Sequence, residues 1–253
     1  ALAKLPYHQR AAAVYKAFGI NLPDEQIDQL MAQCYGDNFN NEAICPITSL
    51  DENTHVLELW HGPTSAFKDM ALQCLPRFFS ASAQALREEG KLDNSFCILV
   101  ATSGDTGKAA LEGFKGVDGV SIGVLFPDGG VSDIQRKQMV TTTGGNVQVW
   151  AVRGNFDDCQ TGVKRVFADA DFNQRLMSER KVALSSANSI NWGRLMPQIV
   201  YYISSYSQLV ADGKLEAGQL LDVCVPTGNF GNILACWYAK QMGTPIGLLM
   251  CAS

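Results

Sequence analysis

Hydrophobic residues follow two patterns that alternate along the chain. Short apolar runs with the length and composition of buried strands are separated, in most cases, by stretches whose apolar residues have helical spacing. The strand-like runs are residues 56–59, 96–100, 121–126, 147–151, 182–184, 221–225 and 245–251. This alternation predicts an α/β fold with parallel sheets.

Helical spacing is also present at the start of the chain, where Pro23-Asp24 gives a helix start signal. The expected helices are residues 5–18, 24–34, 67–89, 107–114, 132–142, 156–168, 193–210 and 233–242. The polar stretch 36–41 is the best candidate for a boundary between a helical N-terminal part and the α/β body.

Composition narrows the classes of function. The chain has 253 residues, of which 47% are hydrophobic and 18% charged, with a net charge of −5. No basic stripe of the kind that binds nucleic acid is present, and no apolar run of about 18 residues could span a membrane. None of the eight cysteines has the spacing of a CxxC motif. With no signal peptide at its start, the chain is expected to be soluble and cytoplasmic, with reduced thiols, and without nucleic-acid or membrane partners.

Residues 228–232 form the clearest anion-binding turn. They follow the apolar run 221–225 and precede a predicted helix that begins at Ile233. Backbone N–H groups and the positive end of the dipole at a helix N-terminus bind phosphate well, and glycines allow the backbone to come close. A plain strand-to-helix turn is an equally good interpretation of this pattern alone.

Residues 102–107 form a second turn between a strand and a helix, with Lys108 after it as in a nucleotide-binding P-loop. The match fails, because Thr102 stands where that motif has its first glycine and Ala109 replaces the residue that holds magnesium. ATP is therefore disfavoured. Hydroxyls and amides at a helix start suit a carboxylate, and simple capping by Thr102 or Ser103 stands as the alternative.

Lys68 lies among apolar neighbours in the first turns of a helix expected to start near Thr64. Burial and the positive end of the helix dipole both oppose a charged ammonium. They favour the neutral amine that Schiff-base chemistry needs. The alternative is a solvated lysine with Asp69 beside it.

Four segments together resemble the threonine synthase family, in the order in which that family carries them. The segments are residues 58–69 (ELWHGPTSAFKD), 101–107 (ATSGDTG), 186–194 (SANSINWGR) and 225–232 (VPTGNFGN). The resemblance implies the tryptophan-synthase-β-like fold (fold type II of pyridoxal 5'-phosphate, PLP, enzymes), in which two parallel-sheet α/β domains surround a PLP crevice. The expected parts are a helical N-terminal part at 1–45, a larger PLP-binding domain at 46–94 plus 180–253, and a smaller domain at 95–179.

The resemblance also implies an activity. Members of the family are PLP-dependent lyases of threonine biosynthesis, which convert O-phosphohomoserine and water to threonine and phosphate. They are longer than this chain at both ends, so the chain is expected to be a fragment. The partner of the pyridine nitrogen normally lies in the missing C-terminal region. Oligomeric state is left open.

Site residues follow from the same resemblance. Lys68 would form the Schiff base with PLP and then move protons. The cofactor phosphate would be held by Gly228, Asn229, Phe230, Gly231 and Asn232. The substrate, a small phosphorylated amino acid, would be bound by Ser103, Gly104, Asp105, Thr106, Asn188 and Arg194. Lys108, Arg136, Lys137 and Arg194 are candidates for its phosphate, each with a solvated charge as the alternative.

Other functions compete with this one. Residues 65–68 fit the SxxK pattern of serine acyl-transfer enzymes, but the S-D-N and K-T-G elements of those enzymes are missing. The histidines lack HExxH spacing, which argues against a zinc hydrolase. Within PLP chemistry the alternative is a threonine-synthase-like phospho-lyase, which releases a keto acid, ammonia and phosphate. A catalytically silent protein that keeps the cofactor pocket is a further alternative.

Overall fold

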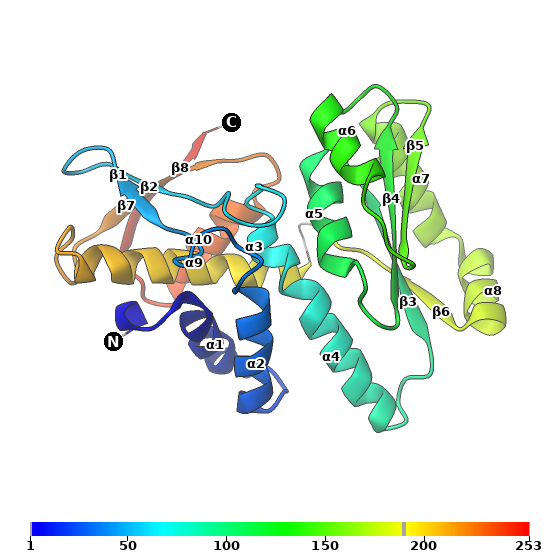
Figure 1. Cartoon of the computed structure of the whole chain (residues 1–253), viewed down its shortest axis with the longest axis horizontal. Coiled ribbons are helices and arrows are strands. Elements are labelled where there is room, and N and C mark those ends of the chain that lie inside the picture. The colour runs from blue at the N-terminus through cyan, green and yellow to red at the C-terminus, as the bar shows by residue number, and fades with distance from the viewer. Residues whose placement is uncertain (1, 189–190, 253) are drawn as a thin grey trace. The chain divides into compact units, whose positions relative to one another are not determined.

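The computed structural model of the chain describes residues 2–188 and 191–252, which divide into two compact units. Unit 1 combines residues 1–74 with residues 189–253, and unit 2 is residues 75–188. Both are drawn in Figure 1. In this division residues 75–94 and 180–188, which the resemblance assigns to the larger domain, are part of unit 2. The reason for 180–188 is that its strand pairs with a strand of unit 2.

Unit 2 is built on a four-stranded sheet with the order β5-β4-β3-β6, all parallel (Figure 1). The strands are β3 (Ser95–Ala101), β4 (Val120–Pro127), β5 (Val147–Val152) and β6 (Val182–Ser185). β4 lies between two strands and most of its residues are buried, as expected for a central strand of a parallel sheet. The parallel sheet predicted from the apolar runs is confirmed.

One helix leads into β3, and the others connect the strands of this sheet. They are α4 (Leu75–Glu88), α5 (Asp105–Phe114), α6 (Asp133–Val140), α7 (Phe156–Ala168) and α8 (Ala170–Arg180). The chain runs outward from β3 through β4 to β5, and then crosses back to place β6 on the other side of β3. Because such crossovers are right-handed, this reversal puts α5 and α7 on opposite faces of the sheet, as Figure 1 shows.

Unit 1 is organised around the 20-residue helix α9 (Trp192–Ala211), which is buried along most of its first half. Its N-terminal segment supplies a short 3-10 helix η1 (Leu2–Lys4), α1 (Tyr7–Ala17) and α2 (Asp24–Cys34). The short helix α3 (Asp69–Leu72) and α10 (Gly231–Gln241) both pack against α9. α9 is therefore the common support of the elements that carry the candidate site residues of this unit.

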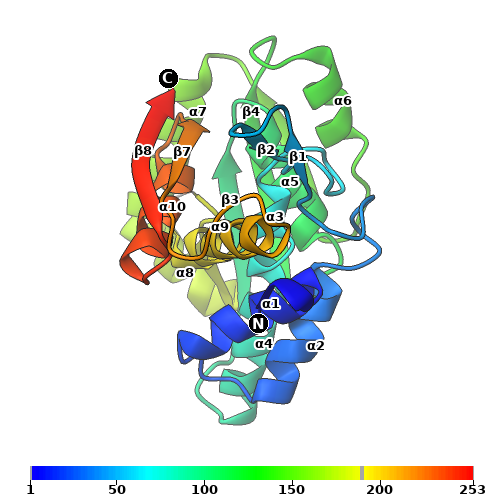
Figure 2. The same ribbon diagram turned by 90° about the vertical axis from the view of Figure 1, so that its left-hand side faces the viewer.

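Strands of unit 1 form two small sheets. β7 (Leu221–Pro226) and β8 (Ile246–Ala252) pair in parallel with α10 between them in the chain, and Figure 2 shows them side by side. On the face of this pair that carries Cys224 and Met250 the side chains are exposed. β1 (Ile47–Ser49) and β2 (His55–Leu57) form an antiparallel hairpin. This hairpin is a departure from the all-parallel expectation.

The structure corrects the helix predicted at residues 67–89. That stretch is broken into α3 and α4, with a turn at Gln73 and Cys74 between them. The break follows from Pro76, because proline cannot donate to the helix ladder and is tolerated in the first turn. Pro76 is accordingly the second residue of α4. The start expected near Thr64 is also wrong, since α3 begins at Asp69.

Candidate active site

Lys68 is the N-cap of α3, with φ −65° and ψ −21°, and is not a residue of the helix interior. Its carbonyl accepts hydrogen bonds from the N–H groups of Ala71 (3.1 Å) and Leu72 (2.8 Å), which begin the helix. The Lys68 side chain is half-buried, and its Nζ lies 4.7 Å from the centroid of the Phe67 ring. The lysine is thus held against an aromatic face and is not a fully solvated surface charge.

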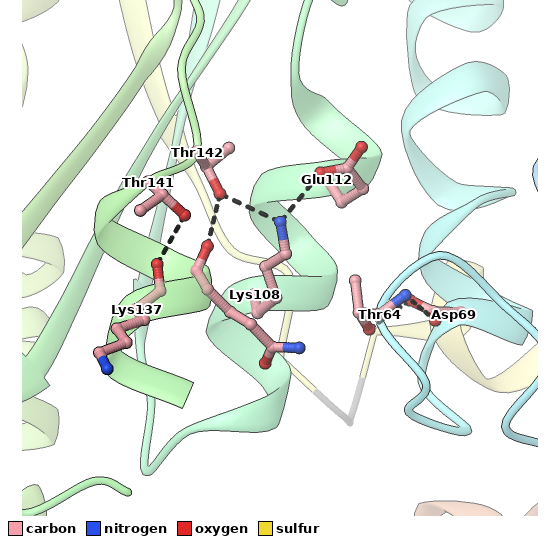
Figure 3. Close-up of polar contacts among 8 residues, drawn as sticks. Thr64, Asp69, Lys108, Glu112, Lys137, Thr141 and Thr142 are labelled. Atoms are coloured by element: carbon pink, nitrogen blue, oxygen red, sulfur yellow. Dashed lines mark hydrogen bonds and ion pairs between the residues drawn. The ribbon is translucent and has the colours of Figure 1, made fainter. Parts of the chain in front are cut away.

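The segment that precedes Lys68 is closed by a buried carboxylate. Asp69 is 0% exposed, and its two carboxylate oxygens accept hydrogen bonds from the backbone N–H and the hydroxyl of Thr64, each at 2.8 Å (Figure 3). Between them Ser65 has a positive φ of 57°, a conformation that is uncommon outside glycine. No sequence pattern indicates this contact, because a Thr-to-Asp spacing of this kind is not a capping box.

His61 anchors the beginning of the same segment. Its two ring nitrogens lie 2.7 Å from Glu58 Oε2 and 2.7 Å from Asn40 Oδ1, and the Thr48 hydroxyl donates to Glu58 Oε1 at 2.6 Å. These hydrogen bonds, with that of Thr48 the larger cause, hold the pKa of Glu58 below its usual range. The network joins the β1–β2 hairpin to the lysine segment within unit 1.

Residues 227–230 connect β7 to α10, and Gly231 and Asn232 are the first two residues of that helix, which begins two residues before the predicted start at Ile233. Phe230 is the N-cap of α10 in the left-handed conformation, with φ 58° and ψ −2°, and its side chain is exposed. No side chain caps this helix, and no acidic residue lies in its first turn. The N-terminus of α10 therefore presents backbone N–H groups and the positive dipole end without a carboxylate of its own, which suits an anion.

Asn232 has a role that the sequence did not indicate. Its Oδ1 accepts hydrogen bonds from the hydroxyls of Tyr201 (2.5 Å) and Tyr202 (2.6 Å), both on α9. The two tyrosines are buried, and burial is the main reason why the pKa of each is raised. The side-chain oxygen of Asn232 thus ties the first turn of α10 to α9, and these hydrogen bonds hold the preceding loop in place.

In unit 2 the loop after β3 is organised by Thr102. This residue is 1% exposed, and its hydroxyl oxygen accepts hydrogen bonds from the N–H groups of Gly104 (3.0 Å) and Gly107 (2.9 Å). The Thr106 N–H donates to Asp105 Oδ1 at 2.8 Å. The N-cap of α5 is Gly104, without a side-chain cap, so Thr102 is not the cap of this helix; its hydroxyl instead fixes the loop to the first turn of α5. The amides of Gly104 and Thr106 are engaged within the loop. Ser103 is exposed.

Ser103 and Asn188 lie at the same edge of the unit 2 sheet. Ser103 follows β3 and Asn188 follows β6, and these neighbouring parallel strands pair in register from Ser95 with Val182 to Ile98 with Ser185. The strand order reverses between them, and open α/β sheets bind ligands at the carboxyl ends of strands at such a switch point. Asn188 is exposed there.

The candidate anion-binding charges differ in their surroundings. Lys108 Nζ lies 3.1 Å from Glu112 Oε2 and 3.2 Å from Thr142 Oγ1, as Figure 3 shows, so its charge is paired within unit 2. Arg136 and Lys137 are exposed on α6, in agreement with the solvated alternative. Arg194, in the first turn of α9 in unit 1, is only 3% exposed. Its guanidinium is buried and is not a solvated charge.

Candidate metal sites and membrane-spanning helices are absent from the part of the chain that the structure describes. Over residues 2–188 and 191–252, no three or more His, Cys, Asp and Glu side chains gather as metal ligands would. Within the same ranges, none of the helices combines the length and the apolar character needed to cross a membrane.

Comparison with known proteins adds three likenesses. Threonine synthase of Pseudomonas aeruginosa is 43% identical over 250 residues, which are 98% of this chain and 50% of that protein. Human threonine synthase-like 1 is 44% identical over 238 residues, 92% of this chain and 31% of that protein. The crystal structure of PLP-bound threonine synthase from Brucella melitensis superposes with a TM-score of 0.85 at 41% identity, covering 99% of this chain and 50% of that one. No protein-family model matches the chain.

The α/β architecture of the chain is therefore that of fold type II PLP enzymes. Within that class the chain is a homologue of the threonine synthases, and the predicted resemblance is confirmed. It spans about half the length of the threonine synthases that it matches, and less of the threonine synthase-like 1 proteins.

Proposed function

We propose that the chain carries the PLP-binding part of a threonine synthase, with Lys68 as the residue that holds the cofactor. The observation that carries the proposal is the N-terminus of α10, which is preceded by a glycine-containing loop and has neither a side-chain cap nor an acidic residue in its first turn. A phosphate group fits such a terminus, because it meets N–H donors and a positive dipole end. Lys68 and this loop belong to the same unit, on helices that both pack against α9.

The residues divide the work as follows. When bound, PLP supplies an electron sink for the charge that develops at the substrate Cα. Lys68 holds the cofactor through its Nζ and then, as a base within reach of the substrate, moves the Cα proton. Gly228, Asn229, Phe230 and Gly231 present the backbone that holds the cofactor phosphate. Asn232 contributes by fixing that backbone to the two tyrosines of α9.

The reaction proposed is the conversion of O-phosphohomoserine and water to threonine and phosphate. Ser103 and its neighbours at the start of α5, together with Asn188, are the residues proposed to bind the substrate's carboxylate. Gly104 and Thr106 shape the loop, since their amides already have acceptors within it. Arg194 is the candidate for the substrate phosphate, because a buried guanidinium attracts an anion more strongly than an exposed one.

A first experiment tests the cofactor. The protein is mixed with PLP, its visible absorption spectrum is recorded, and the mixture is reduced with borohydride and mapped by mass spectrometry of peptides. The expected result is a yellow protein that carries the pyridoxyl label on Lys68. Lys68→Ala should lose both the colour and the label, whereas the exposed Lys137→Ala should keep them. A label spread over surface lysines, with Lys68 unmodified, would refute the proposal.

A second candidate reaction is the phospho-lyase reaction, which gives a keto acid, ammonia and phosphate. It is kept because threonine synthase-like 1 is as similar to this chain as the threonine synthases are. The two reactions differ in whether water is added at the β carbon. Incubation of the PLP-loaded protein with O-phosphohomoserine, followed by separate assays for threonine and for keto acid, distinguishes them.

A further inference from the structure

We propose that Asp69 is a positioning residue for Lys68, acting through its two hydrogen bonds with Thr64. The inference deepens the proposed function and rests on it. Asp69 is the residue next to Lys68 in the chain, and it is fully buried. A buried carboxylate is costly unless hydrogen-bond donors compensate it, so its presence beside the cofactor-binding lysine calls for an explanation.

The donors come from the other end of the lysine segment. The Thr64 backbone N–H donates to one carboxylate oxygen and the Thr64 hydroxyl donates to the other, both at 2.8 Å (Figure 3). Hydrogen bonds to an ionised acceptor are stronger than those between neutral groups. The pair therefore closes the chain between Thr64 and Asp69 into a fixed loop, and Lys68 lies within that loop.

Two further contacts show that the loop is built around Asp69. A Cβ on Gly62 would stand 2.5 Å from Asp69 Cβ and 2.6 Å from Asp69 Oδ2, so the backbone of Gly62 is packed directly on this side chain. The Ser65 N–H donates to the Gly62 carbonyl at 3.1 Å, and Ser65 itself has a positive φ of 57°. Only glycine fits at position 62 without moving Asp69.

Lys68 is consequently held from both sides. On its N-terminal side the Thr64–Asp69 hydrogen bonds fix the loop, and on its C-terminal side its carbonyl accepts the first hydrogen bonds of α3. The Tyr35 hydroxyl donates to the Met70 carbonyl at 2.7 Å and ties the same helix to the core of unit 1. The backbone that aims the lysine side chain is thereby set before any ligand arrives, which is what preorganisation of a reactive group requires.

A catalytic role for the Asp69 carboxylate itself is less suited to this geometry. A side chain with 0% exposure whose oxygens both accept hydrogen bonds from Thr64 is not placed to meet a substrate. It acts on Lys68 through the backbone. A positioning role predicts that loss of the Thr64 hydroxyl loosens the loop that holds Lys68. It also predicts that serine at position 64, which keeps the hydroxyl, leaves the loop closed.

The test compares Thr64→Val with Thr64→Ser, and uses Thr161→Val as the control. Thr161 is an exposed threonine of α7 in unit 2, outside the lysine segment and its hydrogen-bond network. The first measurement needs no cofactor: the rate at which trinitrobenzenesulfonate modifies Lys68 in the PLP-free protein, read by peptide mapping with the exposed Lys137 as internal reference. Circular dichroism and the thermal midpoint establish that each variant is folded.

In Thr64→Val the loss of one hydrogen bond to a charged acceptor should loosen the loop. We expect modification of Lys68 to become roughly tenfold faster relative to Lys137, since such a bond stabilises the closed loop by about that factor. Thr64→Ser and Thr161→Val should stay within about twofold of the wild type. An unchanged rate in a folded Thr64→Val protein would overturn the positioning role, whether or not PLP binds.

The second measurement uses the PLP-loaded protein. The fraction of Lys68 labelled after borohydride reduction should fall roughly tenfold in Thr64→Val at limiting PLP and recover in Thr64→Ser. If the wild type labels at Lys68 and Thr64→Val labels equally well, the proposed function stands and the positioning role fails. If the wild type does not label at Lys68 at all, the proposed function fails, and the modification rates of the PLP-free protein decide the positioning role by themselves.

Discussion

Replacement of Gly107 by alanine separates two opposite effects of a methyl group in a helix. Gly107 is in the first turn of α5, where alanine would ordinarily gain about 0.5–1 kcal/mol over glycine. Here the new Cβ would stand 2.5 Å from Thr102 Cγ2 and 2.9 Å from both Met139 Sδ and Val124 Cγ1. Overpacking of this kind costs about 1–3 kcal/mol, so we expect a net loss of about 1–2 kcal/mol of unfolding free energy.

A matched substitution gives the opposite sign. Gly162 is in the middle of α7, and beyond its chain neighbours and the backbone of its own helix no described atom lies within 4 Å of the Cβ that alanine would add. Gly162→Ala should therefore stabilise the protein by about 0.5–1 kcal/mol. In a chain of this size each kcal/mol moves the thermal midpoint by roughly 2–4 °C, which differential scanning calorimetry resolves. Urea denaturation followed by circular dichroism supplies the free energies.

A double mutant tests the cause. Thr102→Ser removes the methyl group that Gly107→Ala would strike, and keeps the hydroxyl oxygen that accepts from Gly104 and Gly107. Gly107→Ala should therefore cost less in the Thr102→Ser background than alone, with a coupling energy of about 1 kcal/mol. If Gly107→Ala raised the thermal midpoint as Gly162→Ala does, the close packing of α5 on the β3 loop would be refuted.

Three further predictions concern buried and paired groups. Asn232→Ala removes the acceptor shared by two buried tyrosine hydroxyls of α9, and should cost about 1–3 kcal/mol of unfolding free energy in urea denaturation. Cys45 should resist iodoacetamide at about pH 8 while the exposed Cys224 is alkylated, because burial raises the pKa of the Cys45 thiol to about 12; peptide mapping gives the order. Hydrogen bonds from Thr48 and a histidine lower the pKa of Glu58 in the folded protein. The stability that Glu58 contributes is therefore present above its unfolded-state pKa and is lost as the pH falls through the lower folded pKa. Thr48→Val should make the thermal midpoint less dependent on pH below about pH 5.

Elements whose signal is local were predictable. The apolar runs at 96–100 and 121–126 became β3 and β4 with shifts of a residue at the ends, because a strand buried on both faces needs a continuous apolar sequence. The helix expected at 156–168 has the same bounds as α7, whose N-cap Asn155 forms a capping box with Asp158. α8 was not foreseen, although Asp169 both ends α7 and caps α8.

Contacts between residues far apart in the sequence could not be predicted from such patterns. The segment 228–232 was placed correctly at the junction of β7 and α10, but nothing in its own sequence indicates that Asn232 accepts from tyrosines about 30 residues earlier in the chain. The Thr64–Asp69 contact spans Ser65, whose positive φ a serine in the sequence does not reveal. The run predicted at 56–59 overlaps β2, whereas its three-residue partner β1 was missed, because so short a strand is hard to detect from periodicity.

The β7–β8 pair has a consequence for the kinds of substitution that each of its positions will accept. Val225 is 3% exposed, whereas its neighbour Cys224 and the residue opposite Cys224, Met250, are exposed. A saturation library scored for folded protein should therefore admit lysine or glutamate at 224 and 250 and reject both at 225. Charged residues at the two tolerant positions would shrink an apolar patch, which makes them the first sites to change when a more soluble variant is wanted.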